Sequence, residues 1–251
     1  MAEPKGETRD IRAMILAAGF GTRMQKGGED KPKPLVELVG QPLIKYPIAL
    51  LRKAGFDEVV INLHHRADEI QGKIGDGSDL GIKITWLREP EILGTGGGVK
   101  NANRIYPARK WLTINADTVI DLELKNFLYF HSRFNPIATM AVCKPQEDFN
   151  PVFIDSLGRV RKIGSFPERI AEEVTISIVS FCGVQIVSSA MLDHLPEVFS
   201  KMIEHGYFKA LGNNQPILAY SFNGLWLTFD DPQAIAQAQA KHSNRLAKML
   251  A

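Results

Sequence analysis

The sequence predicts an α/β fold, a three-layer α/β/α sandwich around a mostly parallel mixed sheet. Through the first half, short apolar or β-branched segments alternate with segments of helical periodicity. Strands separated by helices pair in parallel through right-handed crossovers. After about residue 135, strand-like segments follow one another with fewer helices between them, which predicts a mixed extension of the sheet. No Pro/Gly/Ser-rich linker divides the chain, so a single domain is expected over residues 11–251.

In the first half, residues 11–135, apolar periodicity and turn residues place the elements. Strands are expected over 12–16, 58–63, 82–87 and 111–115, and helices over 43–53 and 67–74. Pro47 does not suit a helix interior, so the first of these helices should begin late or kink there. Gly55 is a suitable stop for it.

In the second half, residues 136–231, strands are expected over 137–143, 152–154, 159–163, 175–186 and 217–227. Residues 232–250 read as a closing amphipathic helix. Its inward residues should be Ile235, Ala238, Leu246 and Met249 or Leu250.

Composition predicts a soluble cytoplasmic protein without a broad charged surface. The formal net charge of the 251 residues is only +2, which does not favour a nucleic-acid binder driven by bulk electrostatics. No stretch has the length of a membrane span. Residues 1–10 read as a disordered polar tail that lacks the apolar segment of a secretory signal. Cys143 and Cys182 are expected to be buried, reduced thiols. We expect a monomer or a small homo-oligomer.

The first expected strand leads into the glycine-rich turn Leu16-Ala17-Ala18-Gly19-Phe20-Gly21-Thr22-Arg23. In open parallel sheets, ligands bind beyond the carboxyl ends of the strands. Backbone N–H groups in such a turn form an anion-binding nest, to which an arginine adds a planar cationic fork. The dinucleotide fingerprint fails at Met24, and the Gly-Lys-Ser/Thr of a P-loop is absent. Taken alone, the turn fits a structural connection as well as a ligand loop.

Two later segments suit the same anionic ligand. In Lys31-Pro32-Lys33-Pro34-Leu35, the prolines stiffen the backbone and so favour a pre-positioned Lys33 over a solvated basic loop. Residues 94–98 contain four glycines around Thr95, ahead of a helix expected from Val99. Because so many glycines are costly for folding alone, we expect this backbone to approach a flat base or sugar.

Two acidic positions could hold a cation. Asp117 follows the strand expected over 111–115, where a carboxylate suits a Mg²⁺ that also binds phosphate oxygens, although a cap of the next turn explains it equally well. Asp230 and Asp231 precede a proline and most simply cap the last helix, with a metal role left open. The histidines show no zinc-type spacing, and the adjacent His64 and His65 should point to opposite faces of a strand.

Taken in order, these segments resemble the sugar-1-phosphate nucleotidyltransferase (NDP-sugar pyrophosphorylase) family. The family pattern L-A-A/G-G-x-G-T-R, P-K-x-L, L-x-T-x-G and a later strand-ending Asp corresponds to residues 16–23, 32–35, 93–98 and Asp117. The resemblance spans roughly residues 12–240. The sequence is most similar to the N-acetylmuramate 1-phosphate uridylyltransferases and to the mannose- or heptose-1-phosphate guanylyltransferases.

The resemblance implies a Rossmann-like nucleotide-diphospho-sugar transferase fold and an EC 2.7.7-type enzyme. Such an enzyme couples a nucleoside triphosphate to a sugar 1-phosphate with Mg²⁺, giving an NDP-sugar and pyrophosphate. The resemblance implies catalytic roles for Arg23 on the triphosphate, Lys33 at the α-phosphate and Asp117 on the metal. The implied nucleotide contacts are Leu16, Ala17, Ala18, Gly19, Gly21, Thr22, Arg23, Lys33, Gly94, Thr95, Gly96 and Gly97. We expect sugar contacts from Lys144, Asn150 and Gly183.

One departure concerns the second metal carboxylate. Relatives carry W-x-D-x-G-T-P, whereas this chain reads WLTFDDP from Trp226, so Thr228 stands at the carboxylate position. A hydroxyl is a poor Mg²⁺ ligand. Asp230 shares the strand face of Thr228 and would reach the metal if the strand shifts or ends early.

The sequence is therefore compatible with three functions. An active nucleotidyltransferase is favoured over a catalytically impaired homologue that binds a nucleotide or NDP-sugar. An unrelated phosphate-binding protein, such as a kinase or dehydrogenase, is a minor alternative.

Overall fold

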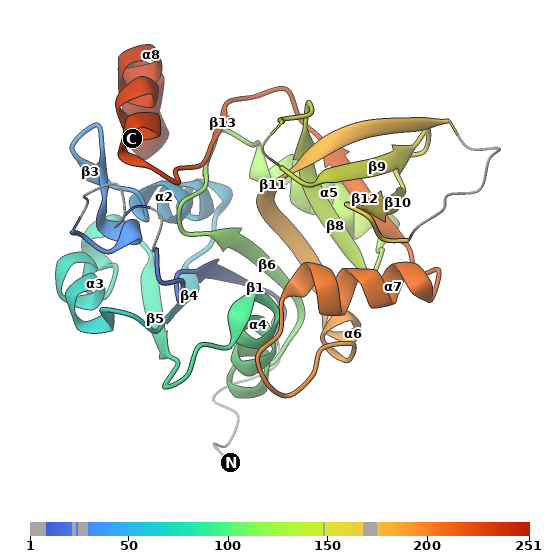
Figure 1. Cartoon of the computed structure of the whole chain (residues 1–251). Coiled ribbons are helices and arrows are strands. Elements are labelled where there is room, and N and C mark those ends of the chain that lie inside the picture. The colour runs from blue at the N-terminus through green and yellow to red at the C-terminus, as the bar shows by residue number, and fades with distance from the viewer. Residues whose placement is uncertain (1–8, 22–23, 25–29, 148, 168–174) are drawn as a thin grey trace. The chain divides into compact units, whose positions relative to one another are not determined.

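The computed structural model describes residues 9–21, 24, 30–147, 149–167 and 175–251 (Figure 1). The chain forms two compact units. Unit 1 comprises Met1–Arg12, Leu93–Thr113 and Lys125–Asn223, and unit 2 comprises Ala13–Ile92, Ile114–Leu124 and Gly224–Ala251. Strands β1 (Arg9–Leu16) and β6 (Ala108–Asn115) each run from unit 1 into unit 2. The single domain over residues 11–251 stays a prediction.

The long strands of unit 2 are parallel, as predicted. β1 pairs with β4 (Glu58–Leu63), and β4 pairs with β5 (Lys83–Arg88) (Figure 1). Ile15 lies beside Ile61, which lies beside Trp86 on the next strand. Helices α2 (Lys45–Ala54) and α3 (Ala67–Ile74) connect these strands. The β-branched sequence of β4 is buried along almost its whole length, as expected of a parallel strand covered on both faces.

Helix α2 begins at Lys45, which confirms the late start inferred from Pro47. The proline is the third helical residue, where its missing N–H has no intrahelical partner to lose. Gly55 ends the helix in the left-handed conformation, with φ 95°. The predicted stop is therefore confirmed.

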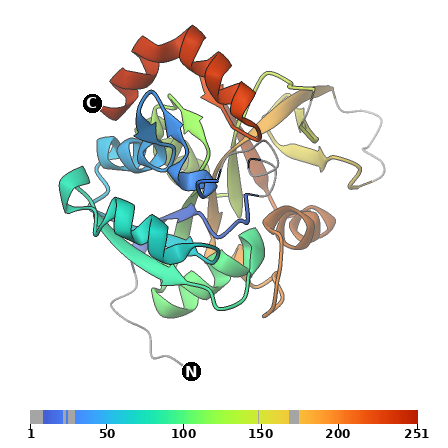
Figure 2. The same cartoon turned by 60° about the vertical axis from the view of Figure 1, so that its left-hand side comes forward.

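Helix α8 (Pro232–Leu250) lies beside α2 in unit 2 (Figure 2). Its predicted inward residues Ile235, Ala238 and Leu246 are buried. The Asp231 carboxylate accepts a hydrogen bond from the N–H of Ala234 at 2.8 Å and so caps the helix. At the other end, Arg52 and Lys53 of α2 donate to carbonyls of the last turn of α8.

Short elements complete unit 2: η1 (Lys33–Leu35), β2 (Glu37–Leu38), β3 (Gln41–Pro42), η2 (Ser78–Leu80), β7 (Val119–Ile120) and β13 (Trp226–Leu227). The last two pair with each other antiparallel. An apolar cluster unites β2, α2, β7 and α8 in one core that includes Met24, Leu38, Val119 and Phe229.

Unit 1 is built around the long strand β11 (Ile176–Ser188), which confirms the mixed extension. β11 is antiparallel to β8 (Ala138–Cys143) on one side and to β9 (Pro151–Asp155) on the other. β12 (Ile217–Ser221) runs parallel to β8, and β10 (Val160–Ile163) forms a hairpin with β9. The helices of this unit are α4 (Gly94–Ile105), α5 (Leu124–Phe134), α6 (Ser189–Leu192), η3 (Met202–Tyr207) and α7 (Phe208–Gly212).

Four boundary predictions were wrong. One is the start of β6, which begins at Ala108 rather than at residue 111. Helix α4 begins at Gly94 rather than Val99, because the chain near Ser200 satisfies the N–H groups of its glycine-rich first turn. The strand expected over 217–227 is two strands, because β12 ends at Ser221 and Phe222-Asn223-Gly224 follows in irregular conformation. β1 begins at Arg9, so residues 9 and 10 belong to the sheet, while residues 1–8 of the predicted tail lie outside the described residues.

The overall class is a mixed sheet with flanking helices. Within the described ranges, every helix is too short or too polar to cross a lipid bilayer.

Candidate functional site

Three of the predicted site residues come together in unit 2. The Lys33 ammonium lies 2.5 Å from Oδ2 of Asp117 and 3.0 Å from Oδ1 of Asp230 (hereafter the Lys33–Asp117–Asp230 cluster). The side chains of Lys33 and Asp117 are 17% and 20% exposed, and that of Asp230 is 40% exposed. The ammonium is therefore largely enclosed and is neutralised by two carboxylates.

Each member of the cluster is positioned by a short structured segment. Asp117 follows the end of β6 by two residues, and Lys33 opens η1 directly after Pro32. Asp230 follows Phe229, which is 1% exposed in the apolar cluster of unit 2. Because such a buried aromatic fixes the backbone beside it, Asp230 is held close to Lys33.

The position of Asp230 shows how a second carboxylate reaches the cluster although Thr228 carries only a hydroxyl. Strand β13 ends at Leu227, so residues 228–231 are not bound by strand alternation. Asp230 consequently reaches the same lysine as Asp117, while the Thr228 hydroxyl donates to Oδ2 of Asp117 at 3.4 Å. The early end of the strand thus brings a carboxylate to the cluster from two residues beyond the family position.

The glycine loop begins where β1 ends. The Leu16 carbonyl accepts a hydrogen bond from the N–H of Ala116, just before Asp117, at 3.0 Å. The N–H of Ala17 donates to the Asn62 side chain at 3.0 Å, and Asn62 in turn donates to Glu89 at 2.8 Å. The N–H of Ala17 is thus already bonded to protein.

Two glycines of this loop have different reasons to be glycine. Gly21 has φ +64°, and a Cβ there would lie 3.0 Å from Cβ of Lys33. It therefore lets the loop pass close to the lysine. A Cβ on Gly19 would meet nothing within 4 Å, so packing does not require that glycine. Thr22 and Arg23, the predicted end of the loop, lie outside the described residues.

The tip of the loop is aromatic. Phe20 is 46% exposed, and its ring centroid lies 5.5 Å from that of His64 and 6.0 Å from that of His65. The expectation that the two histidines point to opposite faces of a strand was wrong, because β4 ends at Leu63 and both follow it. The Nδ1 atom of His64 lies 2.8 Å from the Glu89 carbonyl oxygen, which fixes its ring.

The second glycine cluster lies in unit 1 and is packed against its own chain. The N–H groups of Gly96 and Gly97 donate to the Ser200 carbonyl at 2.8 and 3.2 Å. The Thr95 hydroxyl oxygen accepts from the N–H of Met202 at 3.0 Å. A Cβ on Gly94, which has φ +73°, would lie 2.5 Å from the Ser200 carbonyl oxygen. Close packing against the Ser200 segment therefore requires glycine at these positions, which the sequence did not predict.

The residues expected to contact the sugar also lie in unit 1. Ser180 of β11 pairs with Cys143 on one side and with Pro151 on the other. Lys144 and Asn150, which adjoin these partners and are exposed, therefore lie near the middle of β11, where β8 ends and β9 begins. Gly183 is buried within β11, with φ +73°, where the register with β8 shifts.

Both cysteines are free thiols, as predicted. Cys182 is buried, and burial raises the pKa of its thiol. Cys143 is only partly buried, so the prediction of a buried thiol was wrong for this residue.

The donor set of the Lys33–Asp117–Asp230 cluster suits Mg²⁺. This ion prefers oxygen ligands and is usually held by one or two carboxylates together with substrate phosphates and water. Two carboxylates already converge on one cation here. Across the described parts of the chain, no group of three or more His, Cys, Asp or Glu side chains forms an all-protein metal cage. The cluster therefore fits a cation that is shared with a phosphate ligand.

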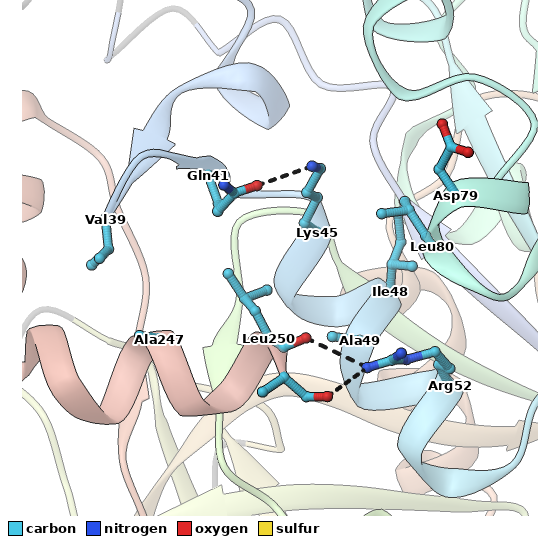
Figure 3. A pocket seen from close by; sticks show the side chains of 11 residues that line it. Val39, Gln41, Lys45, Ile48, Ala49, Arg52, Asp79, Leu80, Ala247 and Leu250 are labelled. Carbon is cyan, nitrogen blue, oxygen red and sulfur yellow. Dashed lines mark hydrogen bonds between the residues drawn. The ribbon is translucent and has the colours of Figure 1, made fainter.

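A separate pocket of about 440 Å³ lies in unit 2 between α2, η2 and the end of α8 (Figure 3). Lys45 and Arg52 reach into it, but they bond to Gln41 and to the carbonyls of Leu250 and Ala251. None of the predicted site residues lines this pocket.

Known proteins resemble the chain over most of its length. A UTP–glucose-1-phosphate uridylyltransferase from Synechocystis sp. is 30% identical over 220 residues, which cover 78% of this chain and 56% of the relative. The catalytic subunit beta of mannose-1-phosphate guanylyltransferase from Drosophila pseudoobscura pseudoobscura is 29% identical over 227 residues, which cover 88% of this chain and 60% of the relative. The chain thus spans somewhat more than half the length of these relatives.

The fold has counterparts of known structure. HddC from Yersinia pseudotuberculosis superimposes with a TM-score of 0.75 at 24% identity, covering 92% of this chain and 98% of HddC. The nucleotidyl transferase family model matches residues 12–245, which include both glycine clusters and all three members of the Lys33–Asp117–Asp230 cluster. The chain therefore belongs to the nucleotidyl transferase family.

Proposed function

We propose that the protein couples a nucleoside triphosphate to a sugar 1-phosphate, giving an NDP-sugar and pyrophosphate. The observation that carries this proposal is the Lys33–Asp117–Asp230 cluster, in which an ammonium lies within 3.0 Å of two carboxylates. Gly21 of the glycine loop lies against the same lysine. Phosphoryl transfer requires groups of these kinds: a cation, carboxylates that can hold a metal, and a glycine-rich loop that offers backbone N–H groups.

In the proposed reaction, an oxygen of the sugar 1-phosphate attacks the α-phosphorus of the nucleotide in line. The bond from that phosphorus to the bridging oxygen breaks, and pyrophosphate leaves with the electron pair. The protein then acts through positioning and charge stabilisation, with no covalent enzyme intermediate. Lys33 would neutralise charge at the α-phosphate, and Arg23 would bind the triphosphate and the departing pyrophosphate. Asp117 and Asp230 would hold Mg²⁺, whose chemistry when bound is to neutralise phosphate charge.

The glycine loop would bind phosphate through its outer residues. Since the Ala17 N–H already bonds to Asn62, Leu16 and Ala17 would shape the loop. The N–H groups from Ala18 to Thr22 would then face the phosphates, and the open space beside Gly19 supports this division.

The remaining substrate contacts are also proposals. Residues 94–97 would lie against the base, and Lys144, Asn150 and Gly183 would contact the sugar. The related proteins are named for different nucleotides, uridylyl and guanylyl transfer, so the base stays open. We expect a cytoplasmic monomer or small homo-oligomer with no nucleic-acid partner.

A second candidate function is favoured by Thr228, which stands where the family resemblance implies a metal-binding carboxylate. A catalytically impaired homologue would bind a nucleotide or NDP-sugar without turning it over. Such a protein would gain thermal stability from the ligand and release no pyrophosphate.

Pyrophosphate release separates the two candidates. The purified chain is incubated with Mg²⁺, each of the common nucleoside triphosphates and a panel of sugar 1-phosphates. At least one pair should give release, and Lys33→Ala should lower the rate on the order of 10²–10³-fold, as removal of a preorganised charge donor does elsewhere. Lys31→Ala is the matched control, because this lysine lies two residues away and pairs on the surface with Glu37. No release from any pair, together with thermal stabilisation by a nucleotide, selects the impaired homologue.

A further inference from the structure

We propose that Lys33 is an internal substitute cation that keeps divalent metal off Asp117 and Asp230 until nucleotide phosphates draw the lysine away. Metal and triphosphate would then enter the site together. This inference rests on the proposed function and adds to it an order of binding.

The ammonium contacts both carboxylates that would hold a metal. Nζ of Lys33 is 2.5 Å from one Asp117 oxygen and 3.0 Å from one Asp230 oxygen. Mg²⁺ binds carboxylate oxygens at about 2.0–2.1 Å, so an ion ligated by these two oxygens would lie in the same gap. Two positive charges in that gap repel each other strongly, and the lysine must leave before a metal enters.

The protein holds the lysine in this gap. Lys33 lies between Pro32 and Pro34, and its side chain is 17% exposed. The backbone of Gly21 lies against its Cβ and limits where the side chain can turn. An ammonium that is largely removed from water is costly without an anionic partner. The Lys33 ammonium would therefore leave the two carboxylates readily only for another anion. In the proposed reaction, that anion is a phosphate group of the nucleotide.

The net charge of the cluster determines how a bare metal ion and a metal–triphosphate complex would bind to it. With Lys33 in place the three side chains carry a net charge of −1, and without its ammonium they carry −2. A bare divalent ion must therefore displace a well-paired cation and leave it unpaired. A metal–triphosphate complex avoids this cost, because its phosphates pair with Lys33 while its metal takes the carboxylates.

Metal binding in the absence of any nucleotide tests the idea. Mn²⁺ alone is titrated into the full chain and free Mn²⁺ is followed by electron paramagnetic resonance. Lys33→Met should bind Mn²⁺ at least about tenfold more tightly than wild type, since an opposing charge has been removed. Lys31→Met should leave the affinity unchanged, and Lys33→Met/Asp117→Asn should lose the gain. Urea unfolding establishes that each variant is folded, with Lys33→Gln as a second neutral replacement.

Two results would overturn the inference. In one, neither Lys33→Met nor Lys33→Gln binds Mn²⁺ more tightly than wild type. In the other, the gain persists after Asp117→Asn, so that the metal lies elsewhere. Failure of the proposed function is a different observation, the absence of pyrophosphate release from the wild-type chain, and the Mn²⁺ titration contains no nucleotide.

Discussion

The hydroxyl of Thr228 donates a hydrogen bond to Oδ2 of Asp117, the same oxygen that Lys33 approaches at 2.5 Å. Position 228 therefore faces Asp117 directly. Asp230, two residues further along, lies 3.0 Å from the same lysine. The chain thus has a hydroxyl where the family resemblance implies a carboxylate, and a carboxylate two residues later that reaches the same cluster.

We expect Thr228→Asp to leave activity nearly unchanged. The new carboxylate would lie beside Asp117, and repulsion between the like charges offsets what a further metal ligand contributes, so kcat/KM should change by less than about threefold. Steady-state pyrophosphate release measures this. A gain of a hundredfold or more would instead show that the hydroxyl had impaired the site and that Asp230 does not serve.

Asp230→Asn should lower kcat on the order of 10²–10³-fold, because it removes one of the two carboxylates that pair with Lys33 and would hold Mg²⁺ at the reacting phosphates. Asp231→Asn is a matched control one residue away. Asp231 caps α8 through the N–H of Ala234, so its loss should cost at most about 1 kcal/mol of folding free energy and leave kcat unchanged. Equal losses of activity in the two variants would contradict a specific role for Asp230.

Sequence patterns predicted Lys33 and Asp117 more securely than Asp230, for a physical reason. A rigid Pro-Lys-Pro segment and a strand-ending Asp are local features. The place of Asp230 depends instead on where β13 ends, and Trp226-Leu-Thr-Phe alternates like a continuing strand. The parallel core was predictable for the same local reason, because the β4 and α3 ranges expected from periodicity match the observed ones.

The second glycine cluster shows what local patterns cannot supply. Its glycines suggested a ligand because nothing nearby in sequence explained them. Ser200, far along the chain, occupies the space that side chains would need. Nothing local marks that contact, and it also explains why α4 begins at its glycines.

Gly94→Ala should destabilise the protein by at least about 2 kcal/mol, because alanine resists a positive φ and its Cβ would lie 2.5 Å from the Ser200 carbonyl oxygen. Gly72→Ala is the control. Gly72 lies within α3, is exposed and has nothing within 4 Å of a Cβ. That change should stabilise by about 0.5–1 kcal/mol. Urea unfolding gives both values. An unchanged stability in Gly94→Ala would contradict the packing explanation and leave ligand binding as the reason for this glycine.

His131 should make the protein less stable in mild acid. This residue of α5 is 2% exposed, and its Nδ1 lies 2.8 Å from the Thr139 hydroxyl oxygen. Burial, reinforced by the positive charge of Lys110, lowers the pKa of His131 to about 4, whereas the unfolded chain has a pKa of about 6.5. Between these values the unfolded chain binds a proton that the folded chain does not. The contribution of His131 is therefore fully present above about pH 6.5, falls as the pH drops toward 4 and changes no further below that.

The whole effect amounts to about 3 kcal/mol at most, the free energy equivalent of the pKa difference. His131→Gln removes the titrating group, so melting temperatures of the variant should fall less steeply than those of wild type between pH 7 and 4.5. The comparison of slopes matters because glutamine also changes packing and the bond to Thr139, which shifts stability equally at every pH. Parallel curves for the two proteins would mean that His131 can take up its proton without unfolding, through an opening that lets water reach its ring.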